Sequence, residues 1–129
     1  MKKSIFAIVF FSLMLTACGS SASANTPDKV IEAYLAALAA GNSTQAVNLS
    51  CADWESSAMD DSAAFEGVEV QLANANCTVD SQDDSGAVVS CTGKFVFSYA
   101  GGETQSLGLE FKKYVLVYKN DAWRMCGYQ

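Results

Sequence analysis

The hydrophobic pattern of this chain changes period at Gly67, and this change constrains the fold more than any other feature of the sequence. Before Gly67, apolar residues recur every three or four positions, as they do on one face of a helix. After Gly67 they alternate with polar residues, as they do in a half-buried strand. Helices followed by consecutive strands are typical of an α+β domain, so we expect N-terminal helices packed on one face of an antiparallel sheet.

Three helical segments are expected before the change of period. Residues 26–28, Thr-Pro-Asp, are typical of a helix start, with a hydroxyl cap, a proline at the first helical position and an early acid. This helix should end at Gly41. A shorter helix capped by Asn42 or Ser43 should follow, and a third is expected over residues 53–64. The first helix should bury a stripe made of Val30, Ile31, Tyr34, Leu35 and Leu38.

About four strands are expected after Gly67. The first runs to a polar turn over residues 80–86, and the second ends at Gly101-Gly102, which is a hairpin signal. The third is expected from Thr104 to Tyr118, with a switch of alternation at Lys112-Lys113 that predicts a bulge or a strand buried on both faces. Asn120-Asp121 should then turn the chain into a last strand over residues 123–128.

The first residues of the chain are typical of a secretory leader. Lys2 and Lys3 precede an apolar run over residues 5–15, which is shorter than the roughly 20 residues that a membrane helix needs. Leu-Thr-Ala immediately before Cys18 resembles the lipobox of bacterial lipoproteins, in which the cysteine is lipidated and becomes the first mature residue. The resemblance implies a leader over residues 1–17 that is removed, and a lipid anchor on Cys18. It places the protein on the cell membrane or the outer membrane with its domain outside the cytoplasm.

The rest of the chain divides into a tether and one domain. Residues 18–26 would comprise the lipidated cysteine and a flexible segment rich in serine and alanine, and residues 27–129 are enough for a single core. Removing Lys2 and Lys3 with the leader takes the net charge from −6 to −8. Nucleic acid is a poor partner for such a surface, because phosphate binding needs clustered Lys and Arg. The expected partners are the bilayer, through acylated Cys18, and an unidentified protein or small molecule.

The domain carries four further cysteines, and an even number outside the cytoplasm predicts two disulfides. Cys77 and Cys91 lie equally far from the middle of the polar turn, so they should face each other across a hairpin. Elimination then pairs Cys51 with Cys126.

A different pairing stays open. Trp123 and Met125 indicate the core face of the last strand, which puts Cys126 on the opposite face and leaves Cys51 with Cys91 as the alternative. Zinc is disfavoured because the chain has no histidine and no paired C-x₂-C element, and the absence of C-x-x-C disfavours redox catalysis.

The sequence contains no evident catalytic constellation. Without histidine, the usual general base and the commonest metal ligand are missing, and we expect neither a metal nor a cofactor. The remaining catalytic candidates are Glu110 and Tyr114, which share one parity of the third strand with Tyr118 and could line a cavity. The alternative interpretation is a solvated acid beside packing aromatic residues.

The segments AYLAALAAGNSTQAV and YKNDAWRMCG resemble the small cone-shaped domains related to nuclear transport factor 2 (NTF2-like), in particular their extracytoplasmic lipoprotein members. The resemblance covers most of residues 27–129 and implies helices on a curved antiparallel sheet. Enzymes of that superfamily use a cone-lining Asp, often with a Tyr or His. We favour a non-catalytic binding or accessory module, which a cone filled by Trp123, Phe95 and Tyr34 would support. The alternative is a small isomerase or lyase acting on a hydrophobic molecule in an open cone.

Overall fold

The computed structural model describes residues 26–129. The expected leader, the lipobox with Cys18 and the tether up to residue 25 lie outside the described residues. Among the helices of the described part, none is long and apolar enough to cross a membrane.

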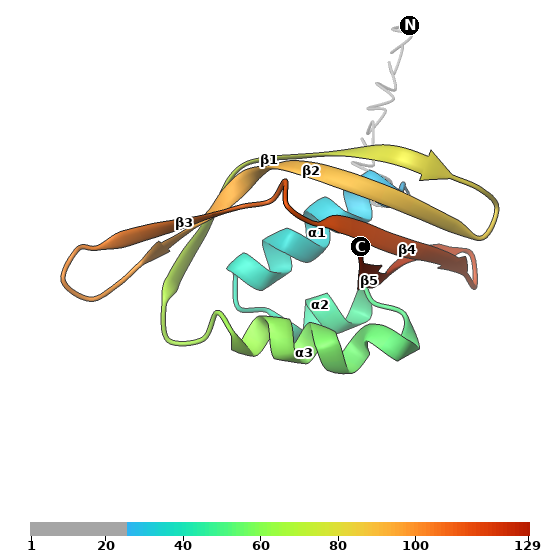
Figure 1. Cartoon of the computed structure of the whole chain (residues 1–129). Helices are drawn as coiled ribbons and strands as arrows, with labels where there is room; N and C mark the ends of the chain where they lie inside the picture. The colour runs from blue at the N-terminus through green and yellow to red at the C-terminus, as the bar shows by residue number, and fades with distance from the viewer. Residues whose placement is uncertain (1–25) are drawn as a thin grey trace, which may run out of the picture.

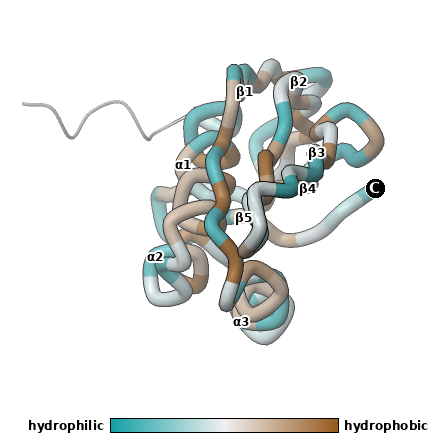
Figure 2. The backbone as a smooth tube through the Cα atoms, turned by 90° about the vertical axis from the view of Figure 1, so that its left-hand side faces the viewer, coloured by the Kyte–Doolittle hydropathy of each residue, from teal (hydrophilic) through white to brown (hydrophobic). Residues whose placement is uncertain are grey.

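Helices lie against one face of an antiparallel sheet, as the change of period predicts (Figure 1). The helices are α1 (Pro27–Ala39), α2 (Ser43–Asn48), the short 3₁₀ helix η2 (Ala52–Trp54) and α3 (Glu55–Ala63). The strands are β1 (Glu69–Gln82), β2 (Gly86–Ser98), β3 (Thr104–Gly108), β4 (Lys113–Lys119) and β5 (Ala122–Tyr128). Figure 1 shows α1 between the sheet and α3, and Figure 2 shows it beside β1 and β5. Helix α1 contacts β1, β2, β5 and α2, so it is the central element of the core.

Helix α1 forms as expected except at its cap. Pro27 occupies the first turn, and the stripe from Val30 to Leu38 is buried against the sheet. The prediction of a hydroxyl cap was wrong. Thr26 is at the N-cap position with an extended backbone, but its side chain makes no capping hydrogen bond. An N-cap oxygen normally accepts from the N–H of the second or third helical residue, here Asp28 or Lys29, and the Thr26 hydroxyl accepts from neither. Asn42 does cap α2, because its Oδ1 accepts from the Gln45 N–H at 3.1 Å.

The sheet has five strands rather than about four, because the expected strand from Thr104 to Tyr118 is interrupted. Residues 109–112 leave the sheet, so the switch of alternation at Lys112-Lys113 marks a break rather than a bulge. Strand β3 pairs with the second half of β2, and β4 pairs with the first half. The break forms because Leu109 turns inward, where it is 2% exposed and its N–H donates to the Gly93 carbonyl at 3.0 Å.

Gly93 is where the long β1–β2 ribbon bends. Its φ is +107°, and a Cβ there would lie 2.6 Å from the Asn74 carbonyl oxygen, so only glycine fits. On β1 the register shifts between Ala73 and Asn76, with Asn74 itself at φ +55°. This irregularity curves the sheet around α1 and carries the end of β2 with β3 beyond the helices (Figure 1).

Both expected disulfides are present in the structure. Cys77 and Cys91 are directly opposite in the β1–β2 register, with Cα atoms 4.1 Å apart. Cys51 joins Cys126 with a Cα separation of 5.3 Å. Cys126 does face away from the core side of Met125, but the chain after α2 runs beside β5, where Cys51 N–H donates to the Met125 carbonyl. Cys51 therefore reaches Cys126 from outside the sheet edge.

Candidate functional site

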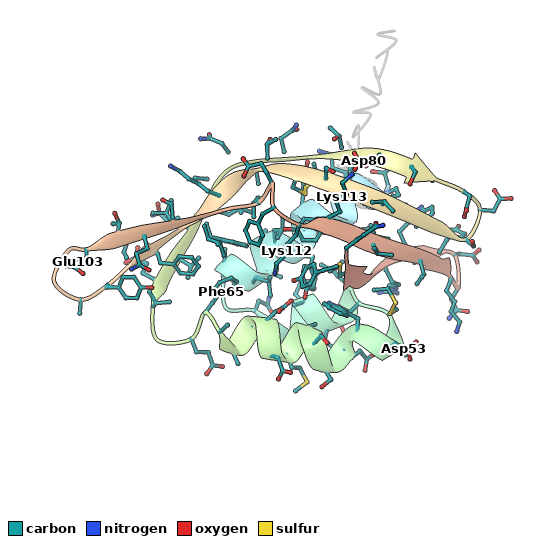
Figure 3. The ribbon with its side chains drawn as sticks, in the orientation of Figure 1. Asp53, Phe65, Asp80, Glu103, Lys112 and Lys113 are labelled. Carbon is teal, nitrogen blue, oxygen red and sulfur yellow. A yellow bond between two sulfur atoms is a disulfide. The ribbon has the colours of Figure 1, made fainter. Side chains whose placement is uncertain are left out.

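A mainly apolar pocket of about 190 Å³ opens between the sheet and the last turn of α3. It lies beside the break between β3 and β4, and Figure 3 places Phe65 and Lys112 in this space between the sheet and the helices. The pocket is lined by Leu35, Leu38, Asp61, Ala64, Phe65, Phe95, Leu107, Gly108, Leu109, Phe111, Lys112, Tyr114 and Tyr128.

The structure separates the residues that sequence reasoning proposed as cavity lining. Tyr114 is buried on β4 and lines the pocket. Glu110 does not line it, because the chain has already left the sheet, and its exposed side chain lies beside Gly108 instead. Tyr118 is also exposed and lies away from the pocket. Among the residues expected to fill the cone, Phe95 forms part of the pocket wall, whereas Tyr34 and Trp123 are buried elsewhere.

The polar centre of the pocket is Asp61 of α3, which sequence reasoning missed. Its Oδ2 accepts hydrogen bonds from the Tyr34 hydroxyl at 2.9 Å and from the Tyr128 hydroxyl at 2.5 Å. Trp54 Nε1–H donates to the Tyr34 hydroxyl oxygen at 3.2 Å. Four segments, α1, η2, α3 and β5, are thus tied together at one carboxylate.

The tyrosines around Asp61 remain neutral at physiological pH. Burial, together with the negative charge of Asp61, raises the pKa of Tyr114 to about 12. Burial also raises the pKa of Tyr34 and of Tyr128 well above the usual range, and for Tyr128 the hydrogen bond to Asp61 adds to the effect. Neutral phenols keep their protons, so they act as hydrogen-bond donors to the carboxylate.

Lys112 supplies a positive charge at the pocket. Its Nζ lies 4.1 Å from the centre of the Tyr128 ring and 5.5 Å from that of Phe111, both within the range of a cation–π interaction. The ion pairs within residues 26–129 are Lys29 with Glu32 and Lys113 with Asp80, and Lys112 belongs to neither. The pocket therefore combines an apolar wall, a carboxylate held by two phenols and an ammonium group over aromatic rings.

A second groove, of about 540 Å³, lies outside the sheet edge along the Cys51–Cys126 disulfide. Its walls carry Asp53 and Arg124, so it is more polar than the first pocket. Arg124 Nη1 donates to the Asn48 carbonyl there. In the described range, no group of three His, Cys, Asp or Glu residues could hold a metal ion.

Comparison with family models and with curated proteins gives no match. Solved structures do match. A SEC-C motif protein from Rhodopseudomonas palustris has a TM-score of 0.56 at 17% identity, covering 83% of this chain and 80% of that one. A protein from Xanthomonas campestris that is named for the calcium/calmodulin-dependent protein kinase II association domain has a TM-score of 0.59 at 18% identity. The match covers 78% of this chain and 80% of that one. A protein from Streptomyces avermitilis that is named as a dehydratase of the NTF2-like family has a TM-score of 0.50 at 17% identity. The match covers 80% of this chain and 95% of that one. The chain therefore has an NTF2-like fold.

Proposed function

We propose that this protein is a lipid-anchored module outside the cytoplasm that binds a small, mainly apolar molecule in the pocket at Asp61 without transforming it. The anchor is supported by the lipobox-like residues before Cys18. The location outside the cytoplasm is supported by two disulfides, which are typical of oxidising compartments. Mass spectrometry of the native protein tests it. A mature N-terminus at Cys18 that carries acyl mass is expected, and an intact leader or an unmodified cysteine would contradict it.

The binding function is carried by one observation, the apolar pocket built around a carboxylate that is already engaged by two phenols. A dry cavity of about 150 Å³ is known to bind benzene, so about 190 Å³ suits a single ring with a short substituent. Aromatic and aliphatic walls with a few convergent polar groups are the usual composition of a ligand site. The pocket therefore favours a binding module with a small ligand.

Catalysis is disfavoured by the same geometry. Both tyrosine hydroxyls donate to Asp61 Oδ2, so this oxygen is already engaged by hydrogen bonds within the domain. The phenols are neutral, the four cysteines of the described part are in disulfides, and the sequence has no histidine. The described lining of the pocket therefore offers no histidine, no free thiol and no ionised phenol as a catalytic group.

Two alanines of α3 provide a test of binding. Both are exposed, but Ala64 lines the pocket and the neighbouring Ala63 does not. Methyl NMR spectra of the full chain in lipid nanodiscs should show p-cresol shifting the methyl signals of Leu38 and Leu109. Ala64→Phe should abolish these shifts by filling the pocket, and Ala63→Phe should leave them. Shifts that survive Ala64→Phe, or none in the parent protein, would refute the proposal.

An isomerase or lyase is the second candidate, because the Asp61 carboxylate lines an apolar pocket beside three tyrosines. Within the described residues no hydrogen bond is made to its Oδ1, which leaves that oxygen for a substrate proton. A screen of small hydrophobic carbonyl and hydroxyl compounds decides between the two functions. Glu110 lies outside the pocket, so Glu110→Gln serves as the control. Turnover that is lost in Asp61→Asn and kept in Glu110→Gln would show that the protein is an enzyme and not a binding module.

A further inference from the structure

We propose that the pocket selects an anionic ligand, namely a small organic acid whose carboxylate pairs with Lys112 while its ring or short acyl chain occupies the apolar interior. This inference rests on the proposed binding function. The inference adds the chemical class of the ligand to that function. This class follows from Lys112, the charged group of the pocket that belongs to no ion pair within residues 26–129.

Lys112 is held at the pocket by the break between β3 and β4. Because residues 109–112 leave the sheet, Leu109 turns into the core and the ammonium group of Lys112 lies above the Tyr128 ring. Lys113, one residue later, is on β4 and points to the other side, where its Nζ pairs with Asp80 at 3.1 Å. Two adjacent lysines therefore have different roles, and only Lys112 lines the pocket.

The two charged groups of the pocket are not equally available. Asp61 Oδ2 already accepts two hydrogen bonds from tyrosine hydroxyls, so only its Oδ1 is left for a donor of the ligand. Lys112 has three donor hydrogens, is half-buried and, within residues 26–129, has no carboxylate within 4 Å. A ligand anion gains a charge-assisted hydrogen bond at Lys112, whereas a ligand cation would be repelled there.

The geometry also fixes the orientation of the ligand. The ammonium group of Lys112 lies near the rings of Phe111 and Tyr128. The inner wall of the pocket consists of three buried residues, Phe95, Leu109 and Leu38. The carboxylate should therefore stay near Lys112, away from the apolar wall. The volume of about 190 Å³ limits the body to about one ring.

Three probes of the same shape test the charge preference: 3-phenylpropanoate, its neutral amide 3-phenylpropanamide, and the cation 3-phenylpropylamine. Dissociation constants come from methyl NMR titrations of the full chain in nanodiscs of neutral lipid, with chemical shifts of the pocket leucines as the readout. The carboxylate should bind about tenfold more tightly than the amide, because it gains one charge-assisted hydrogen bond from Lys112. The amine should bind most weakly, because its positive charge is repelled by Lys112.

Lys112→Gln should reduce the affinity for the carboxylate about tenfold and change that for the amide less than twofold. The matched control Lys113→Gln removes the same charge one residue away and should leave both affinities unchanged. If the amide or the amine binds as tightly as the carboxylate, or if Lys113→Gln has the effect expected of Lys112→Gln, the anion preference is wrong while ligand binding stands. If none of the three probes binds, the proposed binding function fails as well.

Discussion

Removing the hydroxyl of Tyr128 should destabilise the domain, because that hydroxyl makes the shorter of the two hydrogen bonds to Asp61. The bond measures 2.5 Å, and the acceptor is a carboxylate beside buried aromatic rings. Hydrogen bonds to charged groups contribute about 1.5–3 kcal/mol, so Tyr128→Phe should lower the free energy of unfolding by about 2 kcal/mol. With a urea m-value of about 2 kcal/mol/M for a domain of this size, the unfolding midpoint should fall by about 1 M.

The control for this prediction is Tyr118→Phe. Tyr118 is 42% exposed on β4, and within the described residues its hydroxyl makes no side-chain hydrogen bond, so the midpoint should move by less than about 0.2 M. Urea unfolding followed by tryptophan fluorescence and circular dichroism measures both variants. Equal midpoint shifts for Tyr128→Phe and Tyr118→Phe would refute the structural role of the bond.

A double variant tests whether Tyr34 and Tyr128 act together through Asp61. Each single variant leaves the carboxylate with one phenol donor, whereas Tyr34→Phe combined with Tyr128→Phe leaves it with neither. An unsatisfied partly buried carboxylate is costly, so the loss should exceed the sum of the single losses by about 1 kcal/mol. Strict additivity would show that the two hydroxyls do not share one acceptor.

Three further predictions concern stability, measured by urea unfolding. Tyr114 has a pKa of about 12 when folded and near 10 when unfolded, so its stabilisation is complete below pH 10 and about 2 kcal/mol of it is lost by pH 12. A flat profile over this range would contradict its burial. Cys51→Ala with Cys126→Ala should cost about 4 kcal/mol, because that bridge closes a separation of 75 residues, and a cost under 1 kcal/mol would contradict this. Gly93→Ala should cost at least about 2 kcal/mol, because its Cβ would meet a carbonyl at 2.6 Å, whereas Gly127→Ala meets nothing within 4 Å. Equal losses for the two glycine variants would be inconsistent with the bend.

The sequence predicts the layers of the fold but not the break in the sheet. Local patterns determine the buried stripe of α1 and the turn at Asn120-Asp121, where both residues have the positive φ of a two-residue hairpin turn. The switch of alternation at Lys112-Lys113 was visible and was interpreted as a bulge or a strand buried on both faces, but a break in the strand satisfies the same pattern. The inward turn of Leu109 onto Gly93 decides between them, and that contact joins residues far apart in the chain. Such a contact cannot be read from the alternation of one strand.

The candidate site was predicted less well, because its acid lies on the helix that was least clear in the sequence. Glu110 was chosen by its parity on a strand that the structure interrupts. Asp61 carries a signal that could have been used, since it continues the helical spacing of Trp54, Ala58 and Phe65 on the inner face of α3. An acid on an otherwise apolar helix face needs donors. Tyr34 and Tyr128, which supply them, come from α1 and β5, so their convergence is a property of the tertiary fold.

We propose that the pocket at Asp61 is the binding site of this domain, and intermolecular nuclear Overhauser effects locate a bound ligand directly. The measurement uses the full chain in nanodiscs with bound 3-phenylpropanoate. Leu38 and Leu109 line the pocket, whereas Val47 and Val117 line the larger groove along the Cys51–Cys126 disulfide. We expect contacts from the ring protons of the ligand to the methyl groups of Leu38 and Leu109. Contacts to the methyl groups of Val47 and Val117 instead would contradict it.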